Sequence, residues 1–514
     1  MPYAPPRHAA APPAPGRHKV VVAGGGLVGL TAALDLARRG VDVVVLDQDD
    51  TVSTGSRAIC FAKRTLEIYD RLGLGARMLD KGVTWNRGEV LFGENAVYGF
   101  DLLPESDHRF PAFINLPQYY AEEWLVEACA ATGRVDLRWR HRVVDLCAAG
   151  NGVALTIDTP GGAYDLHAEW LLACDGANST VRATLGLEFI GKVFRDRFLI
   201  VDVVMRSDRP AVRRFWFEPP FHDGGSVLLH RQPDDLWRID FQLGWDADPE
   251  RERDPVRVRA RVAAMLGDVD FEIEWISVYT FRCRRLEKFR HGRVLFLGDA
   301  AHQVSPFGAR GGNGGVQDAD NLGWKLSAVL HGEAPEALLD SYDAERVPAA
   351  DENILHSTRA TDFITPKDEA ARAYRDAVLE LAGANEFARA MVNSGRLSRP
   401  ATLGGALFTP DVDAWTGGVV PGAPALDAPD GTGWLLGRIG GGFTLLVFGD
   451  PPPGLSADVA IVRVASEGVA ARRYDARPGS AVLLRPDQHV AARWRRPDAA
   501  TIATARARAL GFAA

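Results

Sequence analysis

The stretch Gly24–Gly25–Gly26–Leu27–Val28–Gly29 follows an apolar run at residues 20–23 and precedes a segment with helical spacing. A G-x-G-x-x-G pattern between a strand and a helix is typical of the βαβ unit that binds dinucleotides. In such a unit Gly24 makes the tight turn, Gly26 lets the backbone approach a pyrophosphate, and Gly29 lets the helix pack on the strand. The stretch therefore predicts a Rossmann-like fold near the start of the chain.

The next elements complete this unit. The pyrophosphate would lie beside Leu27 and Val28, because the unpaired N–H groups of a helix N-terminus favour an anion. Residues 41–46 are almost continuously apolar and predict a buried parallel strand. Asp47 ends that strand at the position where an acid would bind a ribose hydroxyl. Glycine turns are common on their own, but the strand, the helix and the spaced acid together favour a dinucleotide, either FAD or NAD.

A second strand that ends on an acid comes much later in the chain. Residues 293–297 predict a buried strand, and Gly298 and Asp299 follow it. Ligands in open α/β folds lie beyond the carboxyl ends of the strands, so Asp299 is placed to bind a ribityl hydroxyl. The glycine-rich loop 308–315 then leads into a helix, where backbone could lie against a flat ring and the helix N-terminus could stabilise a reduced flavin. The alternative is a merely flexible connection.

These segments resemble those of the class A FAD-dependent aromatic hydroxylases, the family of para-hydroxybenzoate hydroxylase, phenol 2-monooxygenase and 3-(3-hydroxyphenyl)propionate hydroxylase. Residues 298–302, with Pro306 and residues 318–326, are similar to the family's flavin-ribityl segment. Residues 175–182 are similar to the Asp-Gly motif near the FAD phosphates that is implicated in NAD(P)H use. The resemblance covers roughly residues 18–400.

Two further segments carry the same resemblance. Ser56–Arg57–Ala58 resembles the arginine segment beside the flavin, and Gln118 resembles a glutamine that contacts FAD. The sequence departs from many relatives at Ser305, where they have a second proline, and at Asp47, where they have glutamate. Neither departure affects the expectation of FAD binding, but Ser305 leaves the lining beside the flavin open.

The resemblance implies bound FAD, NADPH or NADH as co-substrate, and hydroxylation of a phenolic or other aromatic substrate by O₂ through a flavin C4a-hydroperoxide. Alternatives are a reductase or dehalogenating hydroxylase on the same scaffold, or a flavin- or aromatic-binding protein without turnover. A flavin halogenase would be expected to have a Trp-x-Trp-x-Ile-Pro motif, which this chain lacks. The expected cofactor-binding residues are Gly24, Gly26, Leu27, Val28, Gly29, Asp47, Arg57, Gln118, Asp175, Gly298, Asp299, Pro306, Gly311, Gly312 and Asn313.

No catalytic side chain or metal ligand is assigned. His230 and Tyr279 lie on predicted strands, and either could ionise a ring hydroxyl, but a lone His or Tyr there is more often structural. Arg282, Arg284 and Arg285 could bind a substrate carboxylate, although a solvated face is the commoner meaning of such a cluster.

The predicted fold class is α/β, with an FAD-binding domain interleaved with an α+β substrate layer. We expect a disordered Pro- and Ala-rich tail at 1–17, the FAD-binding domain at 18–194 and 290–365, and a substrate-binding sheet at 195–289 that includes strands near 198–205, 237–243 and 271–281. A helical linker would follow at 366–400. The region 401–514 resembles the thioredoxin-like domain of phenol hydroxylase relatives, but it cannot contain C-x-x-C because no cysteine follows Cys283.

Composition limits the classes of partner. The formal net charge of −8 argues against a nucleic-acid or anionic-membrane surface, and no run has the ~20 apolar residues of a membrane span. The five cysteines are few, odd in number and widely spaced, which favours reduced thiols in the cytoplasm. Residues 17–34 imitate a signal peptide but lack a small-residue cleavage site. A small aromatic substrate and O₂ are the expected partners, and a homodimer is left open.

Overall fold

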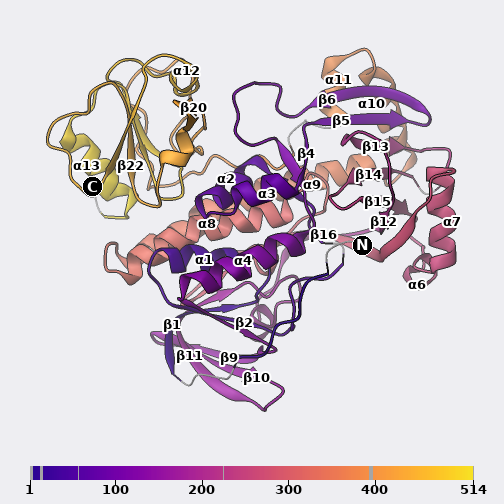
Figure 1. Ribbon diagram of the computed structural model, residues 1–514, viewed down its shortest axis with the longest axis horizontal. Coiled ribbons are helices and arrows are strands. Elements are labelled where there is room, and N and C mark those ends of the chain that lie inside the picture. Colours follow the sequence, from indigo (N-terminus) through magenta and orange to yellow (C-terminus); the bar gives the residue numbers. More distant parts are fainter. Residues whose placement is uncertain (1–3, 12–15, 56, 224, 393–396, 513–514) are drawn as a thin grey trace.

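The first βαβ unit has the architecture that its glycines predict. β1 (Arg17–Ala23) ends at the glycine loop, α1 (Leu27–Arg38) begins directly after it, and β2 (Val43–Asp47) returns parallel to β1. The computed structural model describes residues 4–11, 16–55, 57–223, 225–392 and 397–512 (Figure 1).

An eight-stranded sheet forms the base of the FAD-binding domain. Its main path is β17-β18-β11-β1-β2-β8, and β10 and β9 extend from β11 as an antiparallel pair. The neighbours of β1, β2 and β11, run parallel to it, and β2 and the second half of β11 are almost fully buried, as is typical of a parallel sheet. The remaining bounds are β8 Val135–Trp139, β9 Arg142–Ala149, β10 Gly152–Asp158, β11 Tyr164–Ala173, β17 Arg290–His291 and β18 Val294–Phe296.

Three helices pack together above this sheet. They are α1, α4 (Gln118–Thr132) and α8 (Gly311–Leu330), which lie side by side in Figure 1. The close approach of α8 to α1 depends on glycine, since a Cβ on Gly315 would lie 2.5 Å from Val28 Cγ2. The smaller elements nearby are β3 Cys60–Ala62, β4 Val83–Trp85, β7 Phe113–Asn115, α2 Lys63–Arg71, α3 Gly75–Lys81, α5 Thr180–Thr184, η1 Gly298–Ala300 and η2 Glu336–Leu339.

A second eight-stranded sheet forms the substrate layer, in the order β19-β16-β12-β15-β14-β13-β5-β6. Its pairs are antiparallel except for β13 with β5. The bounds are β5 Arg87–Phe92, β6 Asn95–Asp101, β12 Ile190–Val204, β13 Arg213–Phe217, β14 Val227–Arg231, β15 Leu236–Leu243, β16 Glu272–Arg285 and β19 His302–Gln303. The layer is therefore larger than the predicted segment 195–289, because β5, β6 and β19 come from outside it.

Apolar and polar residues alternate at 237–243, a pattern that is typical of a strand with only one face buried. It predicts a strand with one face open to a ligand, yet in β15 both faces are covered. The apolar face packs in one cluster with α7 (Pro255–Leu266), which follows the short α6 (Pro249–Glu252). The polar face is buried too, where Arg238 donates to Asp240 at 2.9 Å. In β15 the alternating residues therefore lie on two buried faces, one apolar and one polar.

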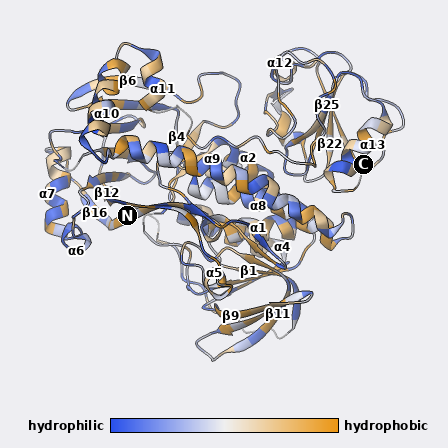
Figure 2. Ribbon diagram, turned by 180° about the vertical axis from the view of Figure 1, so that it is seen from behind, coloured by the Kyte–Doolittle hydropathy of each residue, from blue (hydrophilic) through white to orange (hydrophobic). Residues whose placement is uncertain are grey.

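The segment 366–400, predicted to be a helical linker, contains helices that pack against the substrate sheet. α9 (Asp340–Ile364), α10 (Glu369–Ala382) and α11 (Glu386–Val392) pack in one apolar cluster with strands of the substrate sheet. Figure 2 shows α10 and α11 beside β6, at one end of that sheet. The segment is therefore part of the substrate layer.

The C-terminal part forms a separate sheet in the order β23-β22-β24-β25. β22 pairs parallel with β23 and antiparallel with β24, and β24 pairs antiparallel with β25. The bounds are β20 Pro429–Asp430, β21 Gly433–Trp434, η3 Leu435–Arg438, β22 Thr444–Phe448, β23 Ala460–Val464, α12 Val469–Tyr474, β24 Ala481–Leu484, β25 Val490–Trp494 and α13 Ala499–Ala509.

Residues 4–11 make contacts that a disordered tail would not. Arg7 pairs with Asp50 at 2.5 Å, and the His8 ring stacks on Trp139 with ring centroids 4.8 Å apart. Among the residues that the structure describes, no helix combines the length and the apolarity needed to cross a membrane.

Candidate active site

The loop at residues 24–29 requires glycine at two positions for different reasons. Gly24 has φ = +103°, and a Cβ there would lie 2.4 Å from the carbonyl oxygen of Cys174. A Cβ on Gly29 would lie 2.0 Å from the carbonyl oxygen of Gly24, so α1 could not pack on the turn. At Gly26, by contrast, the nearest atom would be Glu122 Oε1 at 3.5 Å, which is an ordinary contact. The protein leaves Gly26 open to a ligand.

Two carboxylates already hold N–H groups of this loop. Asp47 Oδ2 accepts from Gly25 N at 2.5 Å, and Glu122 Oε1 accepts from Leu27 N at 2.9 Å. Burial raises the pKa of Asp47 to about 6, against the hydrogen bonds from the Asp49 and Gly25 N–H groups. Leu27 was predicted to face the pyrophosphate through its N–H, which Glu122 holds in this structure.

Glu122 connects three segments around the expected cofactor. Its second oxygen accepts from Ser53 N at 2.7 Å, and Gln118 Nε2 donates to its first at 2.7 Å. Gln118 Oε1 in turn accepts from Ala58 N at 3.1 Å. Burial raises the pKa of Glu122, and these hydrogen bonds oppose that effect. The sequence motif pointed to Gln118, whereas Glu122 is the residue that ties α4 to the loop.

Asp175 lies just beyond β11, in the segment that resembles the Asp-Gly motif. One carboxylate oxygen accepts from Val181 N at 3.0 Å, at the start of α5. The other, Oδ1, is buried without a hydrogen-bond partner among the described residues. Burial raises the pKa of Asp175. A buried acceptor without a donor is costly, so a donor from a ligand would be favourable here.

Asp299 follows the second predicted strand and stands at the start of η1. The residue is exposed, but protein surrounds its carboxylate closely enough for desolvation to raise its pKa, while His302 and Arg57 oppose that rise. Gly298 before it has φ = +57°, and a Cβ there would lie 3.0 Å from Val28 Cγ2. Asp299 therefore lies at the carboxyl end of the parallel strands, beside α1, as expected of a ribityl ligand.

A buried group of charged side chains, whose role was not predicted from the sequence, lies behind Asp299. Asp318 accepts from Gly298 N at 3.1 Å and from Arg346 Nε at 2.7 Å, and it lies 2.6 Å from His302 Nε2. Burial raises the pKa of Asp318, but His302 and Arg346 outweigh that effect, and the net shift is downward. This group fixes η1 to α8 and so fixes the position of Asp299.

The loop before α8 is held by Asn313. Its Oδ1 accepts from Ala62 N at 2.9 Å and from Thr65 Oγ1 at 2.6 Å, and its Nδ2 donates to Cys60 O at 2.8 Å. The amide is thus used within the protein, although it was predicted to contact the cofactor. Gly311 and Gly312 precede it in the first turn, and a Cβ on Gly312 would meet Ala58 Cβ and Leu27 Cδ2 at 3.4 Å.

The remaining predicted residues lie at the rim of this site or away from it. Pro306 and Arg57 are exposed, and the Arg57 carbonyl accepts from Arg238 Nη1 at 2.7 Å. Ser56 lies outside the described residues. His230 is buried, and burial lowers its pKa well below the usual value. Arg285 is paired with Asp351 at 2.6 Å and its side chain is only 15% exposed, so at this residue the expected solvated face is not found.

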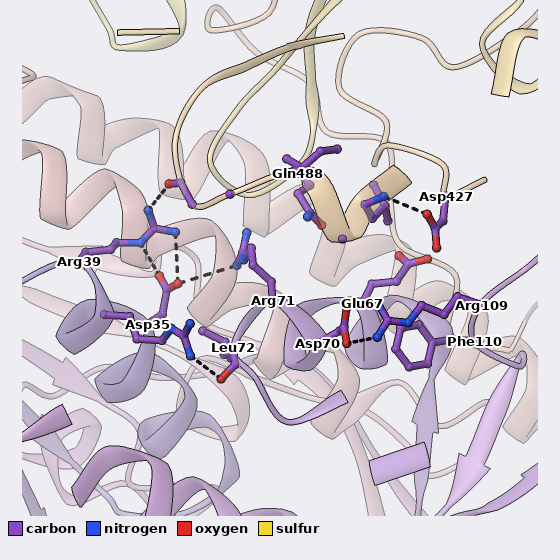
Figure 3. A pocket seen from close by; sticks show the side chains of 16 residues that line it. Asp35, Arg39, Glu67, Asp70, Arg71, Leu72, Arg109, Phe110, Asp427 and Gln488 are labelled. Atoms are coloured by element: carbon purple, nitrogen blue, oxygen red, sulfur yellow. Dashed lines mark hydrogen bonds and ion pairs between the residues drawn. The ribbon is translucent and has the colours of Figure 1, made fainter. Parts of the chain in front are cut away.

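Two cavities stand out, and the larger is not beside these motifs. It has a volume of about 470 Å³ and lies between the FAD-binding domain and the C-terminal sheet. Figure 3 shows that its charged side chains bind one another or backbone: Arg39 holds Asp35, Arg109 holds Asp70, and Arg38 donates to Leu72 O. This cavity is an interdomain gap with satisfied charges.

The smaller cavity, about 370 Å³, has the features of a substrate site. It lies between the substrate sheet and α9–α11 and reaches the loop that leads to α8 through Phe307, Gly308 and Arg310. Its aromatic lining consists of Phe100, Phe215, Phe217, Phe307 and Phe363. A small apolar cavity that adjoins the predicted cofactor loops is where an aromatic substrate would bind.

Comparison with known proteins agrees with this geometry. A flavin-dependent monooxygenase of Mycobacteroides abscessus is 30% identical over 92% of this chain and 96% of its own length. The family model for the FAD binding domain matches residues 17–357. This chain belongs to the class A flavin monooxygenases. The expectation of an FAD-binding flavoprotein of this family is thereby confirmed, while the contacts of single residues with FAD stay predictions.

Other relatives of this flavin monooxygenase include a probable NADH-specific resorcinol 4-hydroxylase of Rhodococcus jostii, 31% identical over 83% of this chain and 80% of the relative. Among solved structures, the flavin-dependent monooxygenase PieE in complex with FAD and substrate superposes with a TM-score of 0.83. That match is 25% identical and covers 97% of this chain and 100% of the other. The fold is thus shared along nearly the whole chain.

Proposed function

We propose that this protein is a monooxygenase that uses NAD(P)H and O₂ to hydroxylate a phenolic or other electron-rich aromatic compound. One observation carries the proposal: the phenylalanine-lined cavity of about 370 Å³ adjoins the loop between β19 and α8, where the flavin ring is expected. The cavity has the size of a small-molecule site.

The residues present fit FAD. The glycine turn leaves Gly26 accessible, Asp175 Oδ1 lacks a donor within the described chain, and Asp299 lies beyond the parallel strands. The pyrophosphate would lie at the loop and α1, and the ribityl chain at Asp299 and Gln118. When bound, FAD supplies the redox chemistry, accepting reducing equivalents from the nicotinamide and passing them to O₂.

The protein's own groups have three tasks in this reaction. The N-terminus of α8 offers N–H groups that stabilise negative charge at the flavin ring. The Asp318–Arg346 pair and Asn313 fix the two loops on which the ring would rest. The phenylalanine walls exclude water from the reacting ring, which keeps the activated oxygen from being lost as H₂O₂.

Which nicotinamide coenzyme the protein uses, NADH or NADPH, is proposed from its relatives. The resorcinol hydroxylase relative is described as NADH-specific, which supports NADH as the first coenzyme to assay. The segment at 175–182 is where the family resemblance places nicotinamide use. Arg182 in this segment is only partly buried and donates to Ala177 O at 2.9 Å.

The C-terminal region is proposed to be a thioredoxin-like domain without redox activity. Its order β23-β22-β24-β25, with a parallel first pair and two antiparallel pairs, supports this assignment. No cysteine follows Cys283, so a dithiol is excluded. All five cysteines are free thiols, which supports a reducing cytoplasm as the location.

The decisive experiment is a screen of purified, yellow protein with NADH, NADPH and ¹⁸O₂ against a panel of phenols, read by mass spectrometry. We expect one ¹⁸O atom in the product of at least one phenol. If the coenzyme is oxidised and phenols of the panel are converted, but no product contains ¹⁸O, the result would instead support a reductase. Loss of halide from halophenols with ¹⁸O incorporation would identify a dehalogenating hydroxylase, and no stimulated coenzyme oxidation would support a binding protein.

A further inference from the structure

Residues 4–11 lie at the carboxyl ends of β2 and β8. These strands pair in parallel with Asp47 beside Trp139, the last residue of each. The His8 ring stacks on Trp139 with an interplanar angle of 9°, and His8 N donates to Asp50 O at 2.6 Å. This segment, named the strap below, therefore lies at the edge of the sheet where Asp47 stands.

The strap makes two further attachments. Thr51 Oγ1 donates to Pro6 O at 2.9 Å, so two successive residues of the loop that follows β2 bind the strap. His8 Nε2 lies 3.5 Å from Glu123 Oε2 of α4. Glu123 follows Glu122, the residue that ties α4 to the glycine loop. The strap thus connects β8, α4 and the loop after β2.

The loop after β2 helps to orient the Asp47 carboxylate. Asp47 Oδ1 accepts from Asp49 N at 2.8 Å, and Arg140 N, just beyond β8, donates to Asp49 O at 2.9 Å. The strap holds the next two residues of this loop, Asp50 and Thr51. A loop that is ordered before a ligand arrives costs less conformational entropy on binding. The strap therefore favours the conformation in which Asp47 can bind a ligand.

The adenosine half of a dinucleotide belongs at this edge of the sheet. In a βαβ unit of this kind the pyrophosphate lies at the glycine loop, and the acid that ends the second strand binds a ribose hydroxyl. The flavin ring is expected elsewhere, at residues 298–315. The strap contacts β8, α4 and the loop after β2, so its effect on the cofactor should act on the adenosine half.

We propose that the strap retains FAD by holding the adenosine half of its site in the binding conformation, with His8 as the positioning residue. The strap lies before residues 17–357, which the family model for the FAD binding domain matches. The inference concerns retention of the cofactor and does not depend on the proposed hydroxylation. Because couplings between binding events are reciprocal, the affinity that FAD gains from the docked strap is also gained by the strap from bound FAD.

A variant of His8 tests the effect on affinity. His8→Pro removes the ring and the N–H donor together, so it should undock the strap. We expect the apoprotein to bind FAD about 10-fold more weakly, because an aromatic contact and a hydrogen bond are lost. Arg134→Met is the control and should leave FAD affinity unchanged, because Arg134 pairs with Asp42 at the amino ends of the same two strands and both side chains are exposed.

Two partial ligands separate this role from a general loss of folding. ADP carries the adenosine half of FAD, and FMN carries the flavin half. In His8→Pro the affinity for ADP should fall by the same factor as that for FAD, whereas the affinity for FMN should equal that of the wild type. Fluorescence titration measures FAD and FMN, and calorimetry measures ADP. Unchanged affinity for FAD or ADP, or an equal loss for FMN, would overturn the proposal.

Limited proteolysis of the wild-type protein tests the same coupling without a variant, and it decides if His8→Pro does not fold. The Arg7 side chain is 77% exposed, so trypsin can cleave after it when the strap undocks. Bound FAD should slow this cleavage, followed by mass spectrometry, by about 10-fold relative to the apoprotein. Cleavage after Arg206, exposed in the loop between β12 and β13, is the control and should change little. Equal cleavage after Arg7 in both forms, or equal protection at both sites, would show that the strap and FAD bind independently.

Discussion

Arg485 of the C-terminal domain donates both guanidinium N–H groups to Glu345 of α9, at 2.7 and 2.9 Å, in an environment from which water is excluded. Lys325 of α8 holds the same carboxylate at 2.8 Å, and Asp487 balances Arg485 from the other side. Burial raises the pKa of Glu345, but Arg485 and Lys325 outweigh it and lower the pKa to about 2. The C-terminal domain is thus held directly to α9 and, through the carboxylate that Lys325 shares, to α8, the helix that follows the predicted flavin loop.

Breaking this pair should destabilise the protein strongly. Glu345→Gln leaves Arg485 and Lys325 with less compensation, and we expect a loss of about 3–5 kcal/mol in the free energy of unfolding. Urea unfolding of the holoprotein measures it. Asp450→Asn is the matched control, because its partner Arg463 is exposed and 3.8 Å away, and it should change little. Equal effects of the two substitutions would contradict the structure.

Two glycines of the loop should separate folding from cofactor binding. Gly29→Ala would place a Cβ 2.0 Å from Gly24 O and should destabilise the apoprotein. Gly26→Ala meets nothing closer than 3.5 Å, so it should fold normally but bind FAD at least tenfold more weakly, because the Cβ occupies the path of the pyrophosphate. Thermal unfolding of the apoproteins and FAD titration distinguish the two. Normal FAD affinity in Gly26→Ala would place the pyrophosphate elsewhere.

Asp47 should make apoprotein stability depend on pH. Its folded pKa of about 6 lies above its unfolded value near 3.9, so the folded state binds the proton more tightly. Stability from this group is present below about pH 4 and is lost as pH rises through 6. Asp47→Asn should therefore flatten that slope and raise apoprotein stability at pH 7 by on the order of 2 kcal/mol, while FAD affinity falls. Urea midpoints between pH 4 and 8 measure it, and an unchanged slope would refute the assignment.

Asp299 tests the position of the ribityl chain. Asp299→Ala should lose most of its bound FAD, because an ordered acceptor at the carboxyl ends of the strands is removed. Its absorbance ratio at flavin and protein wavelengths gives the content. Asp340→Ala is a suitable control, since Asp340 is a largely exposed carboxylate paired with Arg290 on the far end of α9. Full flavin content in Asp299→Ala would remove this residue from the site.

The elements that the sequence predicted well are those that local rules determine. The glycine turn, Asp47 and Asp299 could be predicted because they stand where a strand ends or a helix begins. The bounds of β2 and β18 lie within two residues of the predicted apolar runs. Asn313 shows the limit: its sequence position is in the flavin loop, but its amide is used by Ala62, Thr65 and Cys60. Hydrogen-bond partners that are far apart in the sequence cannot be recognised from a local sequence pattern.

The substrate cavity was beyond such reasoning for a topological cause. Arg213 and Phe100 both line this cavity although they are more than a hundred positions apart, because β13 pairs with β5 and β5 pairs with β6. The segment 213–217 has no alternating pattern that would show which of its side chains line the cavity. The arginines at 282–285 looked more suggestive because they cluster along the chain.

The loop at 485–489 has a consequence for protein engineering. Arg64 of α2 donates to Asp487 O at 2.7 Å, and Trp324 of α8 donates to Asp487 Oδ2 at 3.1 Å, so α2 and α8 both contact the turn between β24 and β25 of the C-terminal sheet. A chimera that takes this sheet from a relative would leave buried charges of α2, α8 and α9 without partners unless the matching faces of these helices were transplanted with it. A recombination boundary drawn between α11 and the C-terminal sheet would therefore separate these buried partners.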